Sequence, residues 1–360
     1  MGKPYRLVVI TVVLLGALAF AAPALATYSP RMVVSSSTQA LGGAGVKIKF
    51  WEDSPDDPIQ KVVVLVPKGY TVNTSMAAGT RLGTATAGVV ASDLSAGATA
   101  SGALVVANKT DFANDALACT NTAPAAVWSF TLAVRGSSFR LPVFVDTVAP
   151  TSGLPGVATL TMCIPAGDTP KGTPGRFVLG SKLLSLTMTT KAISSPKETG
   201  TYRWRASMTP YSPGIGSANL KGIVEVQSLV PVPLELTLKA TVTPSPTAGF
   251  SRVTLTGTFN AAGSPVPGVF LTLSSGTKAN KLKRLGVIST NRDGAFSTKG
   301  DIKQGRTASR RYIQASTTNL ERDLGVGGCQ PTVATVPCVD STVSFNVSSK
   351  IVAFTIPARR

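Results

Sequence analysis

The chain has 360 residues, of which 43% are hydrophobic and 14% charged, and its 35 basic and 17 acidic residues give a formal net charge of +18. This length predicts two or three domains, and this apolar fraction excludes a wholly disordered chain. The chain contains no histidine, which excludes Ser-His-Asp and Cys-His catalytic arrangements. Its 34 Gly and 25 Pro residues predict frequent turns and short strands in place of long helices.

Residues 1–26 have the features of a secretory signal peptide. Lys3 and Arg6 form a basic start, an apolar run spans residues 7–22, and residues 24–26 read Ala-Leu-Ala. Signal peptidase reads such a small-x-small pattern, so cleavage after Ala26 is expected, with an uncleaved anchor as the alternative. The apolar run is shorter than the roughly 20 residues that a membrane-spanning helix needs. We therefore predict a protein that is secreted or held in the cell envelope, without a transmembrane anchor after cleavage.

Residues 27–233 contain short apolar runs separated by turn residues. The segment 46–51 alternates, which places Val46, Ile48 and Phe50 on one face of a strand. Further runs lie at residues 62–66, 102–106, 127–134, 141–145, 158–164, 183–188, 201–207 and 222–229. Many short strands at near-regular spacing are typical of an all-β sandwich or barrel. We expect one large β-sandwich domain over these residues.

An acidic group directly follows the first alternating run. It consists of Glu52, Asp53, Asp56 and Asp57. Oxygen-rich loops in extracellular β domains can bind Ca²⁺, so these four residues form a candidate calcium site, and no other cofactor is expected. Prolines at 55 and 58 restrict the loop and the EF-hand spacing is absent. The alternative is therefore a solvated hairpin tip.

Four cysteines, an even number, are present at positions 119, 163, 329 and 338. In an oxidising compartment this set predicts two disulfides, with three possible connectivities. Proximity along the chain favours Cys119–Cys163 and Cys329–Cys338, one in each domain. A zinc site is the alternative, but the chain has neither a Cys-x-x-Cys pair nor a histidine.

The segment 228–233, Ser-Leu-Val-Pro-Val-Pro, reads as a stiff connector between domains. A second β-sandwich domain is expected over residues 234–360. Its alternating runs lie at residues 234–242, 252–259, 269–273, 284–289, 295–298, 312–316, 343–347 and 351–356. This part holds 16 basic and 6 acidic residues, against 17 and 11 in residues 27–233. The shorter part is therefore the more basic one.

Two basic groups stand out in residues 234–360. They are Lys278, Lys281, Lys283 and Arg284, followed by Arg306, Arg310 and Arg311. If both groups lie at one end of the sandwich they form a polyanion-binding patch, and two separate solvated loops are the alternative. Nucleic-acid modules interleave several aromatic residues for stacking, and only Tyr312 is nearby. We therefore expect anionic glycans or other envelope components as partners, and no specific nucleic acid.

Three motifs after residue 234 carry a family resemblance. They are Val253–Gly257, Gly263–Leu273 and Thr290–Phe296. With them the segment resembles bacterial immunoglobulin-like domains and their transthyretin-like or carboxypeptidase-regulatory-like relatives. Asp293-Gly294 supplies the φ > 0 position of a tight turn, and Phe296 is expected to return to the core. The resemblance implies a stalk, spacer or binding module and names no ligand.

Residues 200–205, Gly-Thr-Tyr-Arg-Trp-Arg, are similar to the segment that opens a late strand in immunoglobulin-type sandwiches. The resemblance implies a corner hydrogen bond from Tyr202 to upstream backbone. Trp204 stands where that family has cysteine, so its inter-sheet disulfide is not carried over. With its segments 66–72 and 141–145, the first part also looks like the large N-terminal domain of uncharacterised secreted bacterial proteins, which implies no activity.

The chain contains no Gly-x-Ser-x-Gly elbow and no P-loop. We therefore predict a non-enzymatic structural or binding protein of the secreted or envelope class that acts through surface loops. A polyanion-binding module in the basic C-terminal part is the second hypothesis. A histidine-free glycosidase is the third, because that chemistry needs only two carboxylates about 5–10 Å apart.

Overall fold

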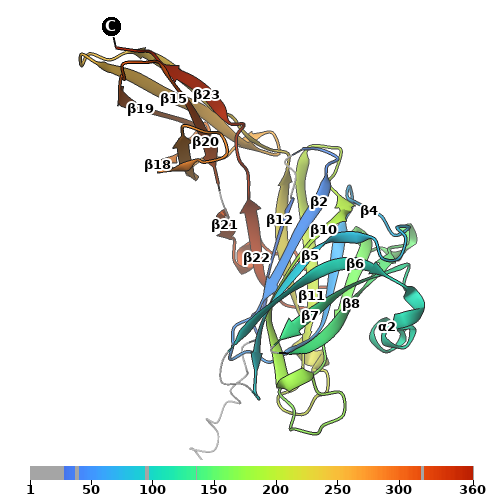
Figure 1. Ribbon diagram of the computed structural model, residues 1–360. Coiled ribbons are helices and arrows are strands. Elements are labelled where there is room, and N and C mark those ends of the chain that lie inside the picture. The colour runs from blue at the N-terminus through green and yellow to red at the C-terminus, as the bar shows by residue number, and fades with distance from the viewer. Residues whose placement is uncertain (1–27, 37–39, 94–96, 135, 318–319, 360) are drawn as a thin grey trace, which may run out of the picture.

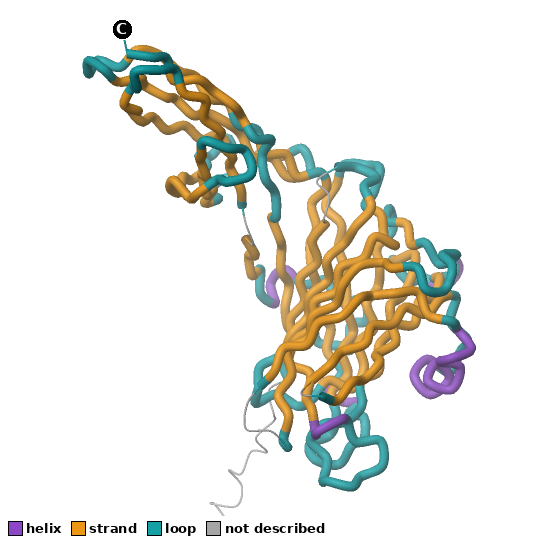
Figure 2. Tube along the Cα trace, in the orientation of Figure 1, coloured by secondary structure: helices purple, strands orange, loops and turns teal. Residues whose placement is uncertain are grey.

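The computed structural model describes residues 28–36, 40–93, 97–134, 136–317 and 320–359. The predicted signal peptide therefore lies outside the described residues. Almost all regular structure consists of β-strands, which confirms the all-β class (Figures 1 and 2). A broad unit with long strands carries a slimmer unit at one end, and the chain end at the far tip is marked C in Figure 1.

The broad unit is built on one sheet of 14 strands. In chain order they are β1 (Arg31–Ser36), β2 (Ala44–Trp51), β3 (Ile59–Pro67), β4 (Thr71–Val72), β5 (Arg81–Ala91), β6 (Ala98–Ala107), β7 (Ala126–Val134), β8 (Ser137–Thr147), β9 (Gly156–Cys163), β10 (Ser181–Ser194), β11 (Gly200–Pro210), β12 (Val224–Val232), β21 (Leu320–Asp323) and β22 (Cys338–Phe345). Their order in the sheet is β1-β2-β10-β5-β6-β7-β8-β9-β3-β11-β12-β22-β21, with β4 paired to β10.

This sheet curls until its first strand meets the other end, so the broad unit is nearly closed and barrel-like. β1 lies against β12 and β22 without a backbone ladder to either. Hydroxyl side chains make the junction: the Val34 N–H donates to Ser228 Oγ at 2.9 Å, and Thr342 Oγ1 donates to the Met32 carbonyl at 2.6 Å. Polar groups of the β1 backbone are thereby paired, as burial requires.

The interior of the broad unit is filled by side chains from alternate strand positions. The largest fully buried ones include Trp128, Trp204, Phe50 and Phe130. Tyr70 packs edge-on to Trp204, with ring centroids 4.9 Å apart. Since one continuous sheet encloses this core, the expected two-sheet sandwich over residues 27–233 is not the arrangement found.

The helical segments are short. Within the described residues they are the 3₁₀ turns η1 (Lys109–Phe112), η2 (Pro150–Ser152), η3 (Val178–Gly180), η4 (Leu220–Gly222) and η5 (Val326–Gly328), and one α-helix, α2 (Ala113–Thr120). The helix lies outside the sheet, and Phe112 of η1 together with Ala116 of the helix packs against Val127 and Phe144. The disulfide Cys119–Cys163 fastens its last turn to the end of β9.

The slimmer unit, called the small domain below, is a sandwich of two sheets. One holds β13 (Leu234–Leu236), β14 (Lys239–Pro244), β15 (Phe250–Ala261), β16 (Ser264–Pro265) and β19 (Ala295–Lys303), arranged around β15. The other has the order β18-β17-β20-β23, with β17 (Phe270–Gly276), β18 (Lys283–Ser289), β20 (Ser309–Ser316) and β23 (Val352–Ile356). Leucine, valine and phenylalanine side chains of both sheets form its core.

The turn predicted at 290–296 is present between β18 and β19. Asn291 Oδ1 accepts hydrogen bonds from the backbone N–H groups of Asp293 and Ala295, at 3.0 and 2.9 Å. Gly294 has φ +68°, and a Cβ there would stand 2.6 Å from the Phe259 carbonyl oxygen, so only glycine fits. Phe296 returns to the core as expected.

The corner hydrogen bond expected of Tyr202 is also present. Its hydroxyl donates to the Glu198 carbonyl at 2.8 Å. The bond lies at the start of β11, inside the barrel-like sheet. This local motif therefore occurs here without an immunoglobulin sandwich around it, and two tandem immunoglobulin-like domains are not confirmed.

The segment after β20 leaves the small domain and returns to the large sheet. There β22 pairs in parallel with β12, and β21 pairs with β22, before β23 rejoins the small domain. The sequence division at residue 234 therefore corresponds to the passage from β12 to β13 but misses this return. The disulfide Cys329–Cys338 consequently lies on the broad unit, so both bridges are there. Phe345 at the end of β22 contacts Phe259, with ring centroids 5.7 Å apart, and so extends this strand into the core of the small domain.

Candidate polyanion-binding surface

Strand register brings the two basic groups of the small domain to one end of the sandwich. The turn between β17 and β18 follows Gly276, which pairs with Tyr312 near the start of β20. Lys283 and Ile313 both stand opposite Ser275, one on each side of β17, so roughly 10 Å separates their strands. Both basic groups therefore lie at the same end of the sandwich, as a shared binding surface requires.

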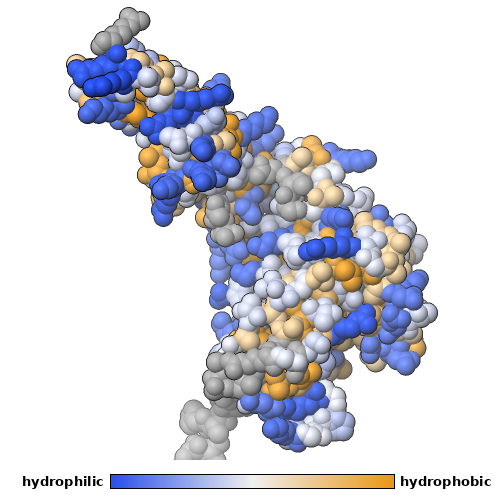
Figure 3. Space-filling view, viewed as in Figure 1, coloured by the Kyte–Doolittle hydropathy of each residue, from blue (hydrophilic) through white to orange (hydrophobic). Residues whose placement is uncertain are grey.

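We call this surface the basic end. It comprises Lys278, Lys281, Lys283, Arg284, Arg306, Arg310 and Arg311. Strand register places it at the end of the small domain opposite the 290–296 turn, and Figure 3 shows hydrophilic residues over much of the surface of the small domain. Six of the seven side chains are exposed and Arg311 is half-buried. Within the described parts of the chain, none of the seven takes part in an ion pair.

The carboxylate of the small domain that is nearest to the basic end is already paired with an arginine. Asp301 on β19 binds Arg252 of β15 through two parallel hydrogen bonds of 3.0 and 3.1 Å. The hydrogen bonds from Arg252 hold the pKa of the Asp301 carboxyl below its usual range. The other two acids of the small domain, Glu235 and Asp293, sit in β13 and in the 290–296 turn, at the end that faces the broad unit. The positive charge of the basic end is therefore not neutralised from within the domain.

Two further basic residues, outside the two predicted groups, belong to this end. Lys303 is the last residue of β19, paired with Phe250. The Arg359 N–H donates to the Gly305 carbonyl at 2.9 Å, which draws the last described residues onto the same loops. Lys303 lies three residues before Arg306 and could have been grouped with it, whereas Arg359 is distant in sequence and joins this end through its backbone contact with Gly305.

Orientation divides the basic end into an outer and an inner side. Arg310 lies over the ring of Tyr312 at 5.5 Å, on the outer face of β20. Arg311 points the other way, because its neighbour two positions on, Ile313, is buried between the sheets. Its cross-strand partner is Phe354 of the core. Arg310 is therefore presented to solvent, while Arg311 reaches toward the sandwich interior.

The acidic group proposed as a calcium site is organised around a lysine. Lys182 Nζ lies 3.4 Å from Glu52 Oε1 and donates to the carbonyls of Ser54 and Asp56. Asp56 Oδ2 accepts a hydrogen bond of 3.1 Å from the Ser29 N–H, whereas Asp53 is exposed. Among the described residues, no three Asp, Glu, Cys or His side chains converge in a way that could hold a metal ion. The calcium hypothesis is therefore not supported, since an ammonium group holds the position that a cation would take.

Glu52 is the most perturbed carboxyl of this group. Burial raises its pKa to about 8, against the opposing effect of Lys182. Tyr28 lies close by, and burial together with Glu52 raises the pKa of its phenol far above the ordinary value. Asp57 lies at the edge of the group, near Asp168. Neither Lys182 nor Tyr28 could be linked to this group from the sequence, because both lie in segments distant from it in the chain.

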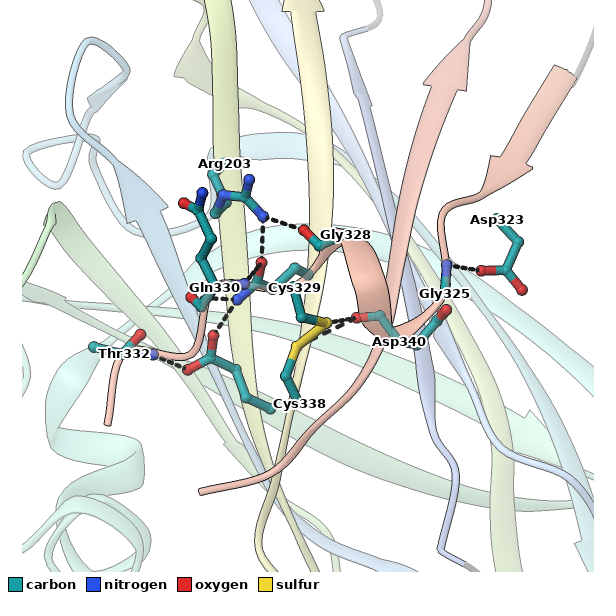
Figure 4. Close-up of a disulfide and its surroundings, with 11 residues drawn as sticks. Arg203, Asp323, Gly325, Gly328, Cys329, Gln330, Thr332, Cys338 and Asp340 are labelled. Carbon is teal, nitrogen blue, oxygen red and sulfur yellow. Dashed lines mark hydrogen bonds between the residues drawn. A yellow bond between two sulfur atoms is a disulfide. The ribbon is translucent and has the colours of Figure 1, made fainter. Parts of the chain in front are cut away.

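A second polar cluster lies under the loop closed by Cys329–Cys338 (Figure 4). The Gln227 amide group is buried and bonds both ways with Gln330: its nitrogen donates to the Gln330 carbonyl at 2.7 Å, and its oxygen accepts from the Gln330 N–H at 3.0 Å. Arg203 donates to Gln227 and to the Gly328 carbonyl, the latter at 2.8 Å. Glu225 accepts from the Thr332 N–H at 3.0 Å. These side chains satisfy loop backbone, so the cluster is structural.

One carboxyl pair could suggest acid–base chemistry. Burial and the neighbouring Asp323 raise the pKa of Asp340 to about 6. Asp340 is only 5% exposed and lies beside the disulfide, whose sulfurs contact its carbonyl. Glycoside hydrolysis needs both carboxyls to reach a sugar. The burial of Asp340 therefore argues against a glycosidase site here.

No helix within the described residues is long and apolar enough to cross a membrane.

Comparison with known proteins adds little. No protein-family model matches the chain, and no curated protein matches it. Some solved structures do match. One is the crystal structure of a tetra-tandem repeat in the extending region of a large adhesion protein, 10% identical over 89% of this chain and 100% of that chain, with a TM-score of 0.20. A likeness this weak carries no inference about fold or function.

Proposed function

We propose that this chain is a non-catalytic binding protein of the secreted or cell-envelope class, and that it binds polyanions through the basic end of its small domain. The observation that carries the proposal is the gathering of Lys278, Lys281, Arg306 and Arg310 with their neighbours at one tip, without an internal counter-charge. A tip lined by one sign of charge attracts oppositely charged polymers and raises their rate of encounter.

The chemistry of the tip favours anionic glycans or wall polymers over single-stranded nucleic acid. Base stacking would need several exposed aromatic rings, whereas Phe250 and Tyr312 at this end are half-buried and Phe354 is buried. Flexible lysine and arginine side chains on loops suit a polymer whose charges repeat without a fixed register. The broad unit then acts as a platform that holds the tip away from its own surface.

The compartment is supported independently of the binding surface. Two disulfides, Cys119–Cys163 and Cys329–Cys338, suit an oxidising environment. The leader expected over residues 1–26 would deliver the chain to such an environment. Absence of histidine from the whole chain supports a non-catalytic role, since the commonest general base is missing.

Retention on immobilised heparin tests the proposal. The quadruple variant Lys281→Ala, Lys283→Ala, Arg310→Ala and Arg311→Ala removes four charges from the basic end. We expect it to lose most of its salt-dependent retention, with an affinity for heparin at least tenfold weaker, because exposed charges act through screened electrostatic attraction.

The matched control removes four exposed lysines from the broad unit, Lys68, Lys109, Lys171 and Lys197, each replaced by alanine. Its net charge equals that of the first variant, so it should keep nearly all its retention if position matters. Equal loss in both variants would reduce the effect to net charge and would contradict a site at the basic end. Circular dichroism and thermal unfolding establish that both variants are folded.

A further inference from the structure

The small domain contains an apolar cavity that the polyanion proposal does not use. Its volume is about 390 Å³, within the range of about 300–1,000 Å³ typical of small-molecule sites. It lies between the two sheets and opens between the edge strands β18 and β19. Buried core residues form its floor, among them Leu255, Leu273, Ile313 and Phe354. The two sheets therefore leave accessible apolar space on this side of the sandwich.

Two glycines keep the mouth of this cavity open. Gly286 of β18 stands opposite Leu273, and Gly300 of β19 stands opposite Val253. Both partners line the cavity, and directly opposed residues of an antiparallel pair face the same side, so both glycines face the cavity. A Cβ added at either glycine would meet no atom within 4 Å. Larger residues would thus fit in the space, and their absence leaves it empty.

Exposed apolar side chains also stand on the β18 side of the entrance, whereas β19 contributes the polar residues Thr298, Lys299 and Asp301. Leu285 is 64% exposed and Val287 is 47% exposed, both on β18 at the mouth. Accessible apolar surface beside an apolar cavity is unfavourable in water and becomes favourable when a ligand covers it.

Positive charge stands at one side of the entrance. Lys283 is paired with Ser275, which lines the cavity, and therefore lies on the cavity face of β18. Arg311 is paired with Phe354, also a lining residue, and lies on the same face of that sheet. The Nε atom of Arg311 is buried and has no hydrogen-bond partner among the described residues. An unpaired buried donor of a charged group costs free energy that an anionic acceptor would recover.

We propose that this cavity binds a single-chain anionic amphiphile, with its hydrocarbon chain between the two sheets and its anionic head at Lys283 and Arg311. The head group is inferred to be anionic because Lys283 and Arg311 are positively charged and Asp301, the carboxylate at the rim, is already paired with Arg252. The part of the ligand inside the cavity is inferred to be a hydrocarbon chain, because a sugar or peptide backbone would leave polar groups without hydrogen bonds on the apolar floor. This site goes beyond polyanion binding and does not rest on it.

An extended peptide added to the free edge of β18 is the competing occupant. The strand is poorly suited to it, because its register with β17 shifts between Leu273 and Ser274, and Lys283 and Arg284 begin it. Irregularity and charge of this kind are the features that discourage strand addition. Peptide binding is accordingly an outcome that the test must separate.

The test uses decanoate and its uncharged counterpart decanol, titrated into the full chain and followed by NMR. We expect saturable binding of decanoate, weakened at least tenfold by Gly286→Leu and by Gly300→Val, which fill the cavity from opposite sheets. Arg311→Ala and Lys283→Ala should weaken decanoate binding at least fivefold but change decanol binding less than twofold. The glycine variants should thus report on binding of the hydrocarbon chain, and the Arg311 and Lys283 variants on binding of the charged head group.

Gly327→Leu is the matched control, because Gly327 is exposed on the broad unit and also has open space around its Cβ position. It should bind decanoate as the wild type does. Binding that survives both cavity-filling variants, or no binding to the wild type, would overturn the proposal. Capture of an apolar strand-forming peptide in place of decanoate would also overturn it. Two filling variants on different strands guard against a folding defect in one of them.

Discussion

The carboxyl group of Glu52 lies in a buried position that disfavours its charged form. Its side chain is fully buried, and Lys182 at 3.4 Å, itself mostly buried, is the nearby cation. Neither carboxyl oxygen has a hydrogen-bond partner among the described residues. Burial therefore outweighs the lysine, and the pKa of Glu52 rises to about 8.

A raised carboxyl pKa makes folding depend on pH in a defined direction. Between the ordinary pKa of 4.5 and the folded value of about 8, the folded chain binds a proton that the unfolded chain has lost. The free energy of unfolding should therefore fall as pH rises through this window, by up to about 1.4 kcal/mol per pH unit. Glu52→Gln should abolish this fall and leave the variant more stable than wild type at pH 8.

Urea unfolding at pH 6.5, 7.25 and 8 measures this slope. Asp340, whose pKa is raised to about 6, acts in the same direction but mainly below this range. Asp53→Asn is the control, because Asp53 is exposed in the same segment, and it should keep the wild-type slope. A Glu52→Gln variant with an unchanged slope would show that Glu52 is already ionised at neutral pH.

At the scale of elements, β22 does the most to define the molecule. It pairs in parallel with β12, and its Thr342 binds the first strand, so it seals the barrel-like sheet. Its last residue Phe345 packs in the core of the small domain. The loop before it is held by the disulfide and by the Gln227 cluster (Figure 4). One strand thus joins the two units.

Removal of the bridge before β22 should weaken the broad unit. Replacing both Cys329 and Cys338 by serine frees a loop with a sequence separation of 9. Loop entropy then predicts a loss of about 2–3 kcal/mol in the free energy of unfolding. Hydrogen exchange should become faster in β22 and along its ladder with β12. Unchanged stability and exchange would show that the Gln227 cluster alone fixes the loop.

Local pattern was enough to predict much of the element structure. Alternation marked most strands, and Asp293-Gly294 marked the turn where Gly294 has positive φ. Closure of the large sheet was not predictable, because it depends on Ser228 and Thr342, more than a hundred residues apart. The parallel pairing of β22 was missed for the same reason, since alternation along one strand does not reveal which strand it pairs with.

In the whole molecule, the basic end and the larger hydrophobic core lie in different units. The broad unit holds the larger core, and the small domain carries the basic end on the side opposite its 290–296 turn. Sequence composition was enough to predict an excess of charge after residue 234. It could not show that two loops share one end, because that follows from the pairing of β17 with both β18 and β20.

A hydrogen-exchange footprint of heparin on the full chain tests binding at the basic end, because it locates the contact without any substitution. We predict slower exchange in peptides that cover residues 277–284 and 304–312, at low salt and reversed by added salt, with the broad unit unchanged. Protection confined to the broad unit, or no protection at the basic end under conditions where heparin is bound, would contradict it.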